Sequence, residues 1–187
     1  KQGSKTSKEL LRTVGGLVAL AGMCAYDADD RPTAERHYQQ ALQLARAAED
    51  EQFTGYVVSL LATLALRSNE PRKALQYATS GLITSACSPA LMADLDCISA
   101  EASATLGDAR QTNTFARRAY IASSQIQPED EPPEAWLVEP GIVEGRHAEA
   151  LRVLGQLESA QTSARLSLLL CANSNPRDRA NRLLVLT

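Results

Sequence analysis

Apolar residues recur every three to four positions through most of this chain, as in the run Leu10, Val14, Leu17, Val18 and Ala21 near its start. This spacing is that of an amphipathic helix with one buried face. Proline, asparagine and glycine interrupt the pattern where helices start or stop. The pattern predicts nine helices, at about 7–28, 32–48, 53–67, 71–82, 89–106, 109–125, 140–154, 157–172 and from 176 onward.

The helices are predicted to come in pairs, because a turn followed by a small residue occurs four times. The small residue recurs after 40, 38 and 48 positions, which is the period of stacked helix pairs. The four copies are Asp29–Ala34, Asn69–Ala74, Gly107–Thr112 and Gly155–Ala160. We therefore expect an all-α helical-hairpin solenoid of about nine helices. Its expected organisation is a linker or cloning remnant at 1–6 and one repeat domain at 7–187, with repeats at 7–48, 51–86, 89–126 and 134–172 and a partial repeat at 176–187.

The regular pattern breaks in the acidic, proline-rich stretch 127–134, which cannot be helical throughout. Two registers compete after it. One has a helix at 140–154, a turn at Gly155 and a partner helix at 157–172, while the rival starts its second helix after Gly145. The first register is preferred because it gives full-length helices, whereas the rival leaves a first helix of barely two turns. We expect the only long irregular segment between Gln125 and about Glu139.

Composition narrows the classes of partner. The 187 residues are 44% apolar and 4% aromatic, and 19 basic residues are interspersed with 22 acidic ones for a net charge of −3. A domain that binds nucleic acid directly usually carries a basic face. No signal peptide is visible, and the apolar runs are broken by glycine or polar residues short of a membrane span. We expect a cytoplasmic segment that contacts neither nucleic acid nor membrane.

The sequence predicts no cofactor, no metal and no enzymatic activity. Cys24, Cys87, Cys97 and Cys171 lie far apart and are expected to be reduced residues of the helix cores. With only two histidines, metal-ligand spacing is absent. No nucleophile elbow, phosphate-binding loop or dinucleotide fingerprint occurs. Gly15-Gly16 lies inside a helical run, where close helix packing explains it better than phosphate binding.

Small and aromatic residues of the first two repeats follow the spacing of tetratricopeptide repeats, which the chain resembles. These residues are Gly22, Ala34, Tyr38 and Ala41, with Ala62, Ala74 and Gly81 in the second repeat. The resemblance implies a right-handed solenoid. A generic helical bundle with coincidental alanine spacing remains the alternative.

A narrower resemblance is to the tetratricopeptide region of actinobacterial helix-turn-helix (XRE-type) transcriptional regulators. It is carried by residues 20–27 and 34–45, by Glu131-Pro132-Pro133 followed by Trp136, and by residues 176–180. Met23 and residues 138–141 depart from that family's pattern. The resemblance implies a regulatory domain that senses a ligand, dimerises or binds a partner, with DNA read by a preceding domain outside this segment. A stand-alone protein-interaction scaffold is the alternative.

The first helix of each pair lines the concave side in arrays of this type, so the partner is expected in that groove. A protein, a peptide or a small ligand is the expected occupant, and a homodimer is a further expectation. Tyr56 is expected to anchor the ligand without belonging to the core. The groove candidates are Met23, Tyr26, Tyr56, Thr63, Arg67, Asp94, Glu101, Glu149 and Arg152.

Overall fold

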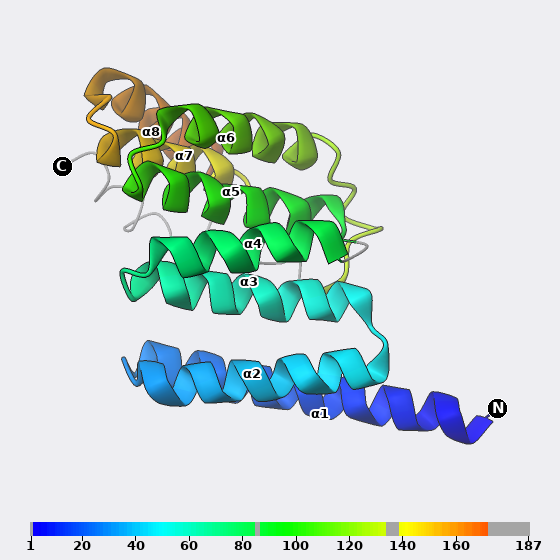
Figure 1. Ribbon diagram of the computed structural model, residues 1–187. Coiled ribbons are helices and arrows are strands. Elements are labelled where there is room, and N and C mark those ends of the chain that lie inside the picture. Colours follow the sequence, from blue (N-terminus) through cyan, green and yellow to red (C-terminus); the bar gives the residue numbers. More distant parts are fainter. Residues whose placement is uncertain (1, 85–86, 134–138, 172–187) are drawn as a thin grey trace. The chain divides into compact units, whose positions relative to one another are not determined.

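The computed structural model describes residues 2–84, 87–133 and 139–171, and within these ranges it is all-helical, with no strand (Figure 1). Eight helices are formed within these described ranges. They are α1 (Gln2–Asp27), α2 (Arg31–Ala48), α3 (Glu51–Arg67), α4 (Pro71–Thr84), α5 (Pro89–Thr105), α6 (Ala109–Ser123), α7 (Ile142–Val153) and α8 (Leu157–Leu170). The helix predicted from residue 176 lies outside the described residues.

The helix boundaries follow the predicted ones within a few residues, except that α1 begins earlier, at Gln2. After the irregular segment, α7 spans Ile142–Val153 and α8 begins at Leu157, so the preferred register is confirmed. Side-chain capping explains where several of the helices begin. The side chains of Asp30, Asp50, Ser88 and Asp108 accept hydrogen bonds from backbone N–H groups of the first turns of α2, α3, α5 and α6.

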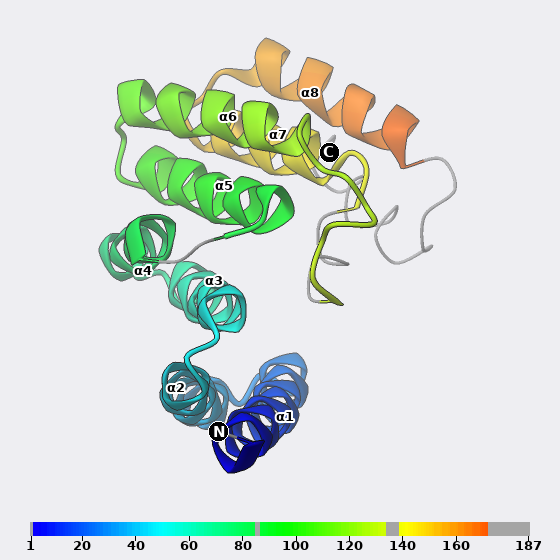
Figure 2. The same ribbon diagram turned by 90° about the vertical axis from the view of Figure 1, so that its right-hand side faces the viewer.

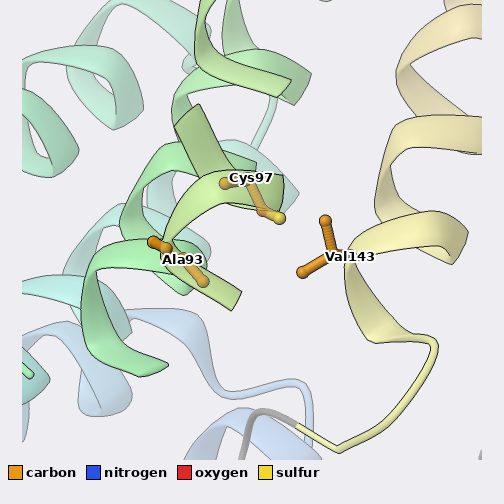
Figure 3. Close-up of a cluster of buried hydrophobic side chains, with 5 residues drawn as sticks. Ala93, Cys97 and Val143 are labelled. Atoms are coloured by element: carbon orange, nitrogen blue, oxygen red, sulfur yellow. The ribbon is translucent and has the colours of Figure 1, made fainter. Parts of the chain in front are cut away.

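The chain divides into two compact units, residues 1–87 (unit 1) and 88–187 (unit 2). In unit 1, α1 packs on α2 and α3 on α4, and α2 also contacts α3 (Figure 2). In unit 2, α5 packs on α6 and α7 on α8, and α5 also contacts α7. The described core of unit 2 includes Ala93, Cys97 and Val143, which bring α5 and α7 together (Figure 3).

One turn geometry recurs inside all four helix pairs. Asp29, Asn69, Gly107 and Gly155 each adopt a left-handed backbone, with φ between 58° and 79°. In the first pair Asp29 N–H donates to the Tyr26 carbonyl at 3.0 Å and Asp30 N–H to the Ala25 carbonyl at 2.9 Å. The same two bonds recur in the other three turns. This is the Schellman ending of a helix, and it satisfies carbonyls that the last turn leaves without partners.

The small residue after each turn allows the two helices of a pair to approach closely. Ala34, Ala74 and Thr112 are fully buried, and Ala160 is 4% exposed. Two glycines of α1 also allow neighbouring helices to approach closely. A Cβ added at Gly22 would lie 2.6 Å from Tyr38 Cε1, and one added at Gly15 would lie 2.8 Å from Phe53 Cε1. The close-packing interpretation of Gly15 is therefore confirmed.

Two sequence expectations about α1 need correction. The cysteines were expected in helix cores, yet Cys24 on α1 is exposed, although Cys97 and Cys171 are buried. The apolar runs were also expected to fall short of a membrane span. The α1 stretch Lys5–Asp27 is long and apolar enough to span one by length and composition, with a mean hydropathy of 1.2, and 17% of its most apolar part is buried. The glycines inside this stretch do not end the helix, which is continuous from Gln2 to Asp27.

The irregular segment before α7 contributes to the start of α5. Glu131 accepts a hydrogen bond from the backbone N–H of Ala90 at 3.2 Å through its Oε1 atom. This places a carboxylate at a helix N-terminus, where the unpaired N–H groups and the helix dipole favour negative charge. Trp136, one of the residues that carried the resemblance, lies outside the described residues.

Candidate partner-binding surfaces

The nine groove candidates fall into two groups. Met23 and Tyr26 on α1, and Tyr56, Thr63 and Arg67 on α3, lie in unit 1. The other four lie in unit 2. They are Asp94 and Glu101 on α5 and Glu149 and Arg152 on α7. The two groups differ in chemistry, since the first is mainly apolar and aromatic and the second is charged.

Tyr56 is a buried side chain, with only 7% of its surface exposed. Its ring stacks on Phe53 with centroids 6.1 Å apart, and its hydroxyl donates to Met23 Sδ at 3.4 Å. A side chain with so little exposed area cannot offer a ligand much contact. The expectation that Tyr56 anchors a ligand without belonging to the core is therefore wrong, and Tyr56 instead joins α3 to α1.

The remaining unit 1 candidates leave a partly exposed surface, here called the α1–α3 face. Met23, Tyr26 and Leu60 are half-buried and pack on the core cluster that contains Tyr38 and Leu61. The face also includes half-buried Thr63 and exposed Arg67. Tyr26 is the aromatic residue of this face. Its side chain packs on the core cluster while part of its surface stays exposed.

In unit 2, Asp94 and Glu101 are joined by a residue that the sequence did not single out. Arg146 on α7 places its Nη1 atom 2.5 Å from Asp94 Oδ1 and its Nε atom 2.5 Å from Glu101 Oε1. The side chains of Arg146, Asp94 and Glu101 are 17%, 15% and 6% exposed. Burial alone would lower the pKa of Arg146, but the two carboxylates raise it well above its usual range. This charged cluster ties α5 to α7 and leaves little for a ligand.

Arg146 could have been suspected from the spacing of its partners. Asp94 and Glu101 are seven residues apart and so lie on the same face of α5, two turns apart. Two acids on an otherwise apolar face require a buried cation, because an unpaired buried charge is costly. The sequence offers several arginines, however, and only the structure identifies which one faces α5.

Glu149 and Arg152 form a pair within α7. Arg152 Nη2 lies 2.6 Å from Glu149 Oε1, and the hydrogen bond to Glu149 raises the pKa of Arg152. The arginine side chain is 51% exposed. Pairs of this kind, three residues apart on a helix surface, contribute a few tenths of a kcal/mol at most. The Arg152 side chain thus remains accessible to a partner, whereas that of Glu149 is 29% exposed.

A shallow pocket of about 360 Å³ lies between α6 and α7. It is lined by Asn113, Ala116, Arg117, Tyr120, Ile121, Ser124 and His147. The Tyr120 hydroxyl lies 3.3 Å from His147 Nδ1, and the rings meet edge to face. Burial raises the pKa of Tyr120 to about 12 and lowers that of His147. Neither ring is therefore charged at neutral pH, and the charged residue of the lining is Arg117.

A smaller pocket, of about 160 Å³, lies in unit 1 between α2, α3 and the start of α4. Its cations are already paired. Lys73 Nζ is 2.8 Å from Glu35 Oε1 and 3.1 Å from Glu70 Oε2, and the hydrogen bonds to these carboxylates raise its pKa above the usual range. These contacts hold α4 to α2, so the pocket is explained by packing.

Asp96 is a buried acid on α5, with its side chain 4% exposed. Its Oδ1 atom makes no hydrogen bond, although Arg118 Nε lies 3.3 Å away. Burial raises the pKa of Asp96 to about 6, against a smaller lowering by Arg118. The folded protein therefore binds this proton more tightly than the unfolded chain does.

We expect Asp96→Asn to stabilise the protein at pH 7.5 by about 2–3 kcal/mol, because it removes a buried carboxylate whose pKa burial raises to about 6. The proton favours the folded state, so the wild type loses this stability as the pH rises from about 4 to about 6. The gain of the variant should vanish near pH 4. Urea unfolding at several pH values measures the difference, with Asp130→Asn in the exposed loop as control. An equal gain at both pH values would contradict the assignment.

Among the described residues, no group of three or more histidine, cysteine, aspartate or glutamate side chains is placed to hold a metal ion. Comparisons with protein-family models, with curated proteins and with solved structures found no match to this chain.

Proposed function

We propose that this chain is a protein-interaction domain built as a right-handed, tetratricopeptide-like solenoid of about nine helices. In this proposal it is the regulatory part of a cytoplasmic helix-turn-helix transcriptional regulator, whose DNA-reading domain lies outside the segment. It binds a protein, a peptide or a small ligand and has no enzymatic activity. The function of the α1–α3 face is to hold that partner.

The observation that carries the proposal is the repetition of one hairpin. Four helix pairs end their first helix with the same left-handed turn and then bury a small residue at the same place. Helical hairpins of this kind stack into arrays because one pair cannot bury its apolar face alone. Such arrays present extended surfaces and bind other chains through them. Repetition of this precision supports a repeat array over a bundle with coincidental alanine spacing.

The α1–α3 face is the part of the repeat array best suited to hold a peptide. Tyr26 and Met23 from α1 and Leu60 from α3 give half-buried apolar area, and Arg67 adds an exposed cation at the end of α3. Aromatic area supplies affinity in such interfaces, and a charge at one end fixes the direction of the peptide. A short peptide with apolar side chains and an acidic end fits this chemistry.

The assignment to a transcriptional regulator rests on the resemblance of residues 20–27 and 34–45 to that family. The net charge of −3 supports a segment that leaves DNA contact to another domain. The four cysteines are free thiols, as suits a cytoplasmic protein. A stand-alone interaction scaffold would share these properties, and a helix-turn-helix encoded upstream of residue 1 distinguishes the two.

We expect Tyr26→Ala to weaken peptide binding by about 1–3 kcal/mol, because truncating an anchoring aromatic residue costs this much at an interface. A random-peptide display library selected on the wild-type chain supplies the probe. Isothermal titration of the enriched peptide then compares wild type and variant. The fold should persist, since Tyr26 is half-buried on the rim of the core cluster.

Ile83→Ala is the matched control, because Ile83 is an apolar residue of the same unit that lies on α4 and is 84% exposed. Its substitution should leave peptide affinity unchanged. Circular dichroism confirms that both variants remain helical. Equal affinity of Tyr26→Ala and wild type would show that the α1–α3 face is not the binding surface. Failure to enrich any peptide would contradict the peptide-binding function itself.

A further inference from the structure

The pocket between α6 and α7, here called the α6–α7 pocket, has the features of a binding site for a small molecule. Both helices belong to unit 2, and they lie side by side (Figure 2). The α1–α3 face belongs to unit 1, so the two surfaces share no residue. The pocket volume of about 360 Å³ is at the lower end of the range of about 300–1,000 Å³ that small-molecule sites occupy. A ligand of one or two rings matches this size.

One face of α6 forms most of the pocket. The lining residues of α6 and its C-cap follow one another at intervals of three, one, three, one and three residues, which keeps them on one side of a helix. His147 of α7 completes the lining. The residues from α6 are Asn113, Ala116, Arg117, Tyr120 and Ile121, followed by Ser124 at the C-cap.

Arg117 supplies the positive charge of the pocket, and the fold does not use it. Its side chain is exposed and forms no ion pair with the described residues, whereas the next residue, Arg118, lies 3.3 Å from Asp96. None of the lining residues is acidic. A guanidinium group can donate two parallel hydrogen bonds to one carboxylate. Asn113, about one turn earlier on the same face, adds an amide N–H donor beside it.

Two aromatic rings form the part of the pocket toward α7. Tyr120 and His147 are half-buried and meet edge to face, with ring centroids 5.6 Å apart. Both rings are uncharged at neutral pH, as their shifted pKa values require. Ile121, which is 53% exposed, adds an apolar side wall. An aromatic ring packs well on such a surface, by stacking or by edge-to-face contact.

The surrounding charges determine which end of a ligand lies where. Glu144 is three residues before His147 on α7, and its negative charge contributes to the raised pKa of Tyr120. An anionic group beside the rings would be repelled by Glu144, and one beside Arg117 would be attracted. We propose that the α6–α7 pocket binds a small aromatic carboxylate, with its carboxylate on Arg117 and its ring against Tyr120 and His147.

The test is a titration of the isotope-labelled chain with benzoate and with phenylacetate, followed by two-dimensional NMR. We expect saturable shifts of the His147 ring and Tyr120 amide signals. The neutral counterparts, benzamide and phenylacetamide, should bind at least about fivefold more weakly, because they lack the charge that pairs with a guanidinium. Absence of a saturable shift with both carboxylates would overturn the proposal. Equal affinity for acids and amides would overturn the assignment of the carboxylate to Arg117.

Arg117→Met should weaken phenylacetate binding about tenfold, since it keeps most of the side-chain volume and removes the charge. Arg110→Met is the matched control. Arg110 is an exposed arginine two turns earlier on α6 that does not line the pocket, so its substitution should leave the affinity unchanged. Both residues are exposed, and circular dichroism should show wild-type helicity. Equal losses in the two variants would show that the general charge of α6, and not the pocket, attracts the carboxylate.

Ile121→Glu tests the position of the ligand from the apolar side. It places a negative charge inside the lining and should abolish phenylacetate binding, while the fold persists because Ile121 is 53% exposed. Wild-type affinity in this variant would place the ligand elsewhere and overturn the proposal.

A peptide that ends in phenylalanine carries the same carboxylate and ring, so a tetrapeptide with this terminus is titrated in parallel. We expect it to bind no more tightly than phenylacetate. Tighter binding of the tetrapeptide, with shifts that extend beyond the pocket, would show that the occupant is a peptide terminus and would overturn the small-molecule assignment. The result does not depend on peptide binding at the α1–α3 face, because that face shares no residue with the α6–α7 pocket.

Discussion

Replacing Arg146 by methionine is expected to lower the free energy of unfolding of unit 2 by about 3–5 kcal/mol, the cost of leaving buried charges without their partner. The arginine is the bridge between Asp94 and Glu101, whose side chains are 15% and 6% exposed. Methionine has a similar volume, so packing is largely kept while both carboxylates lose their cation. Denaturant unfolding followed by circular dichroism measures the loss.

Arg152→Met is the matched control for Arg146→Met. Arg152 is on the same helix and also pairs with a glutamate, but it is 51% exposed, so its substitution should cost less than about 1 kcal/mol. A second arm replaces the cluster as a whole. Combining Arg146→Met with Asp94→Leu and Glu101→Leu should recover most of the lost stability, because an apolar cluster needs no ion pair. Equal losses from Arg146→Met and Arg152→Met would show that the buried cluster is not important for stability.

Replacing Tyr56 by alanine is expected to lower the free energy of unfolding of unit 1 by about 3–4 kcal/mol, because a large buried ring leaves a cavity. The ring is 7% exposed and stacks on Phe53, which is 1% exposed. The melting temperature should therefore fall sharply, and any loss of peptide binding in this variant would follow from the altered fold. Thermal unfolding by circular dichroism gives the shift.

Tyr56→Phe separates the ring from the hydroxyl. It keeps the stacking and removes the hydroxyl that donates to Met23 Sδ. A thioether is a weak acceptor, so the cost should stay below about 1 kcal/mol. If Tyr56→Ala left the melting temperature unchanged while abolishing peptide binding, the side chain would belong to the binding surface after all. The structural assignment of Tyr56 to the core would then be contradicted.

Sequence periodicity was sufficient to place the eight described helices and the turns between them. Proline favours the first turn of a helix, and α4 and α5 begin at Pro71 and Pro89. Asparagine and glycine readily adopt a left-handed backbone, and the turns after α3 and α5 have Asn69 and Gly107 in this conformation. The fourth pair could also be assigned, because the rival register gave a helix too short to be stable. Local signals of this kind do not depend on which helix packs on which.

The side of a helix that faces a partner was harder to predict. Tyr56 and Glu101 were both expected in a groove, yet α3 and α5 are buried over most of their circumference, so both residues are covered. The prediction for Cys24 was wrong in the opposite direction. This residue was expected in a helix core, but α1 packs on one side only and leaves it exposed. Burial depends on how many neighbours a helix has, and periodicity within one helix does not contain that information.

The division of contacts between two units also bears on how the protein unfolds. Most helix contacts are between neighbours in sequence, and the compact units meet in the chain at residues 87 and 88. Local contacts of this kind favour rapid folding, and in repeat proteins cooperativity can weaken between segments. A denaturation curve of the whole chain can then combine two transitions with separate midpoints. Amide hydrogen exchange resolves them residue by residue, so the protection of α3 and of α5 would report on each unit by itself.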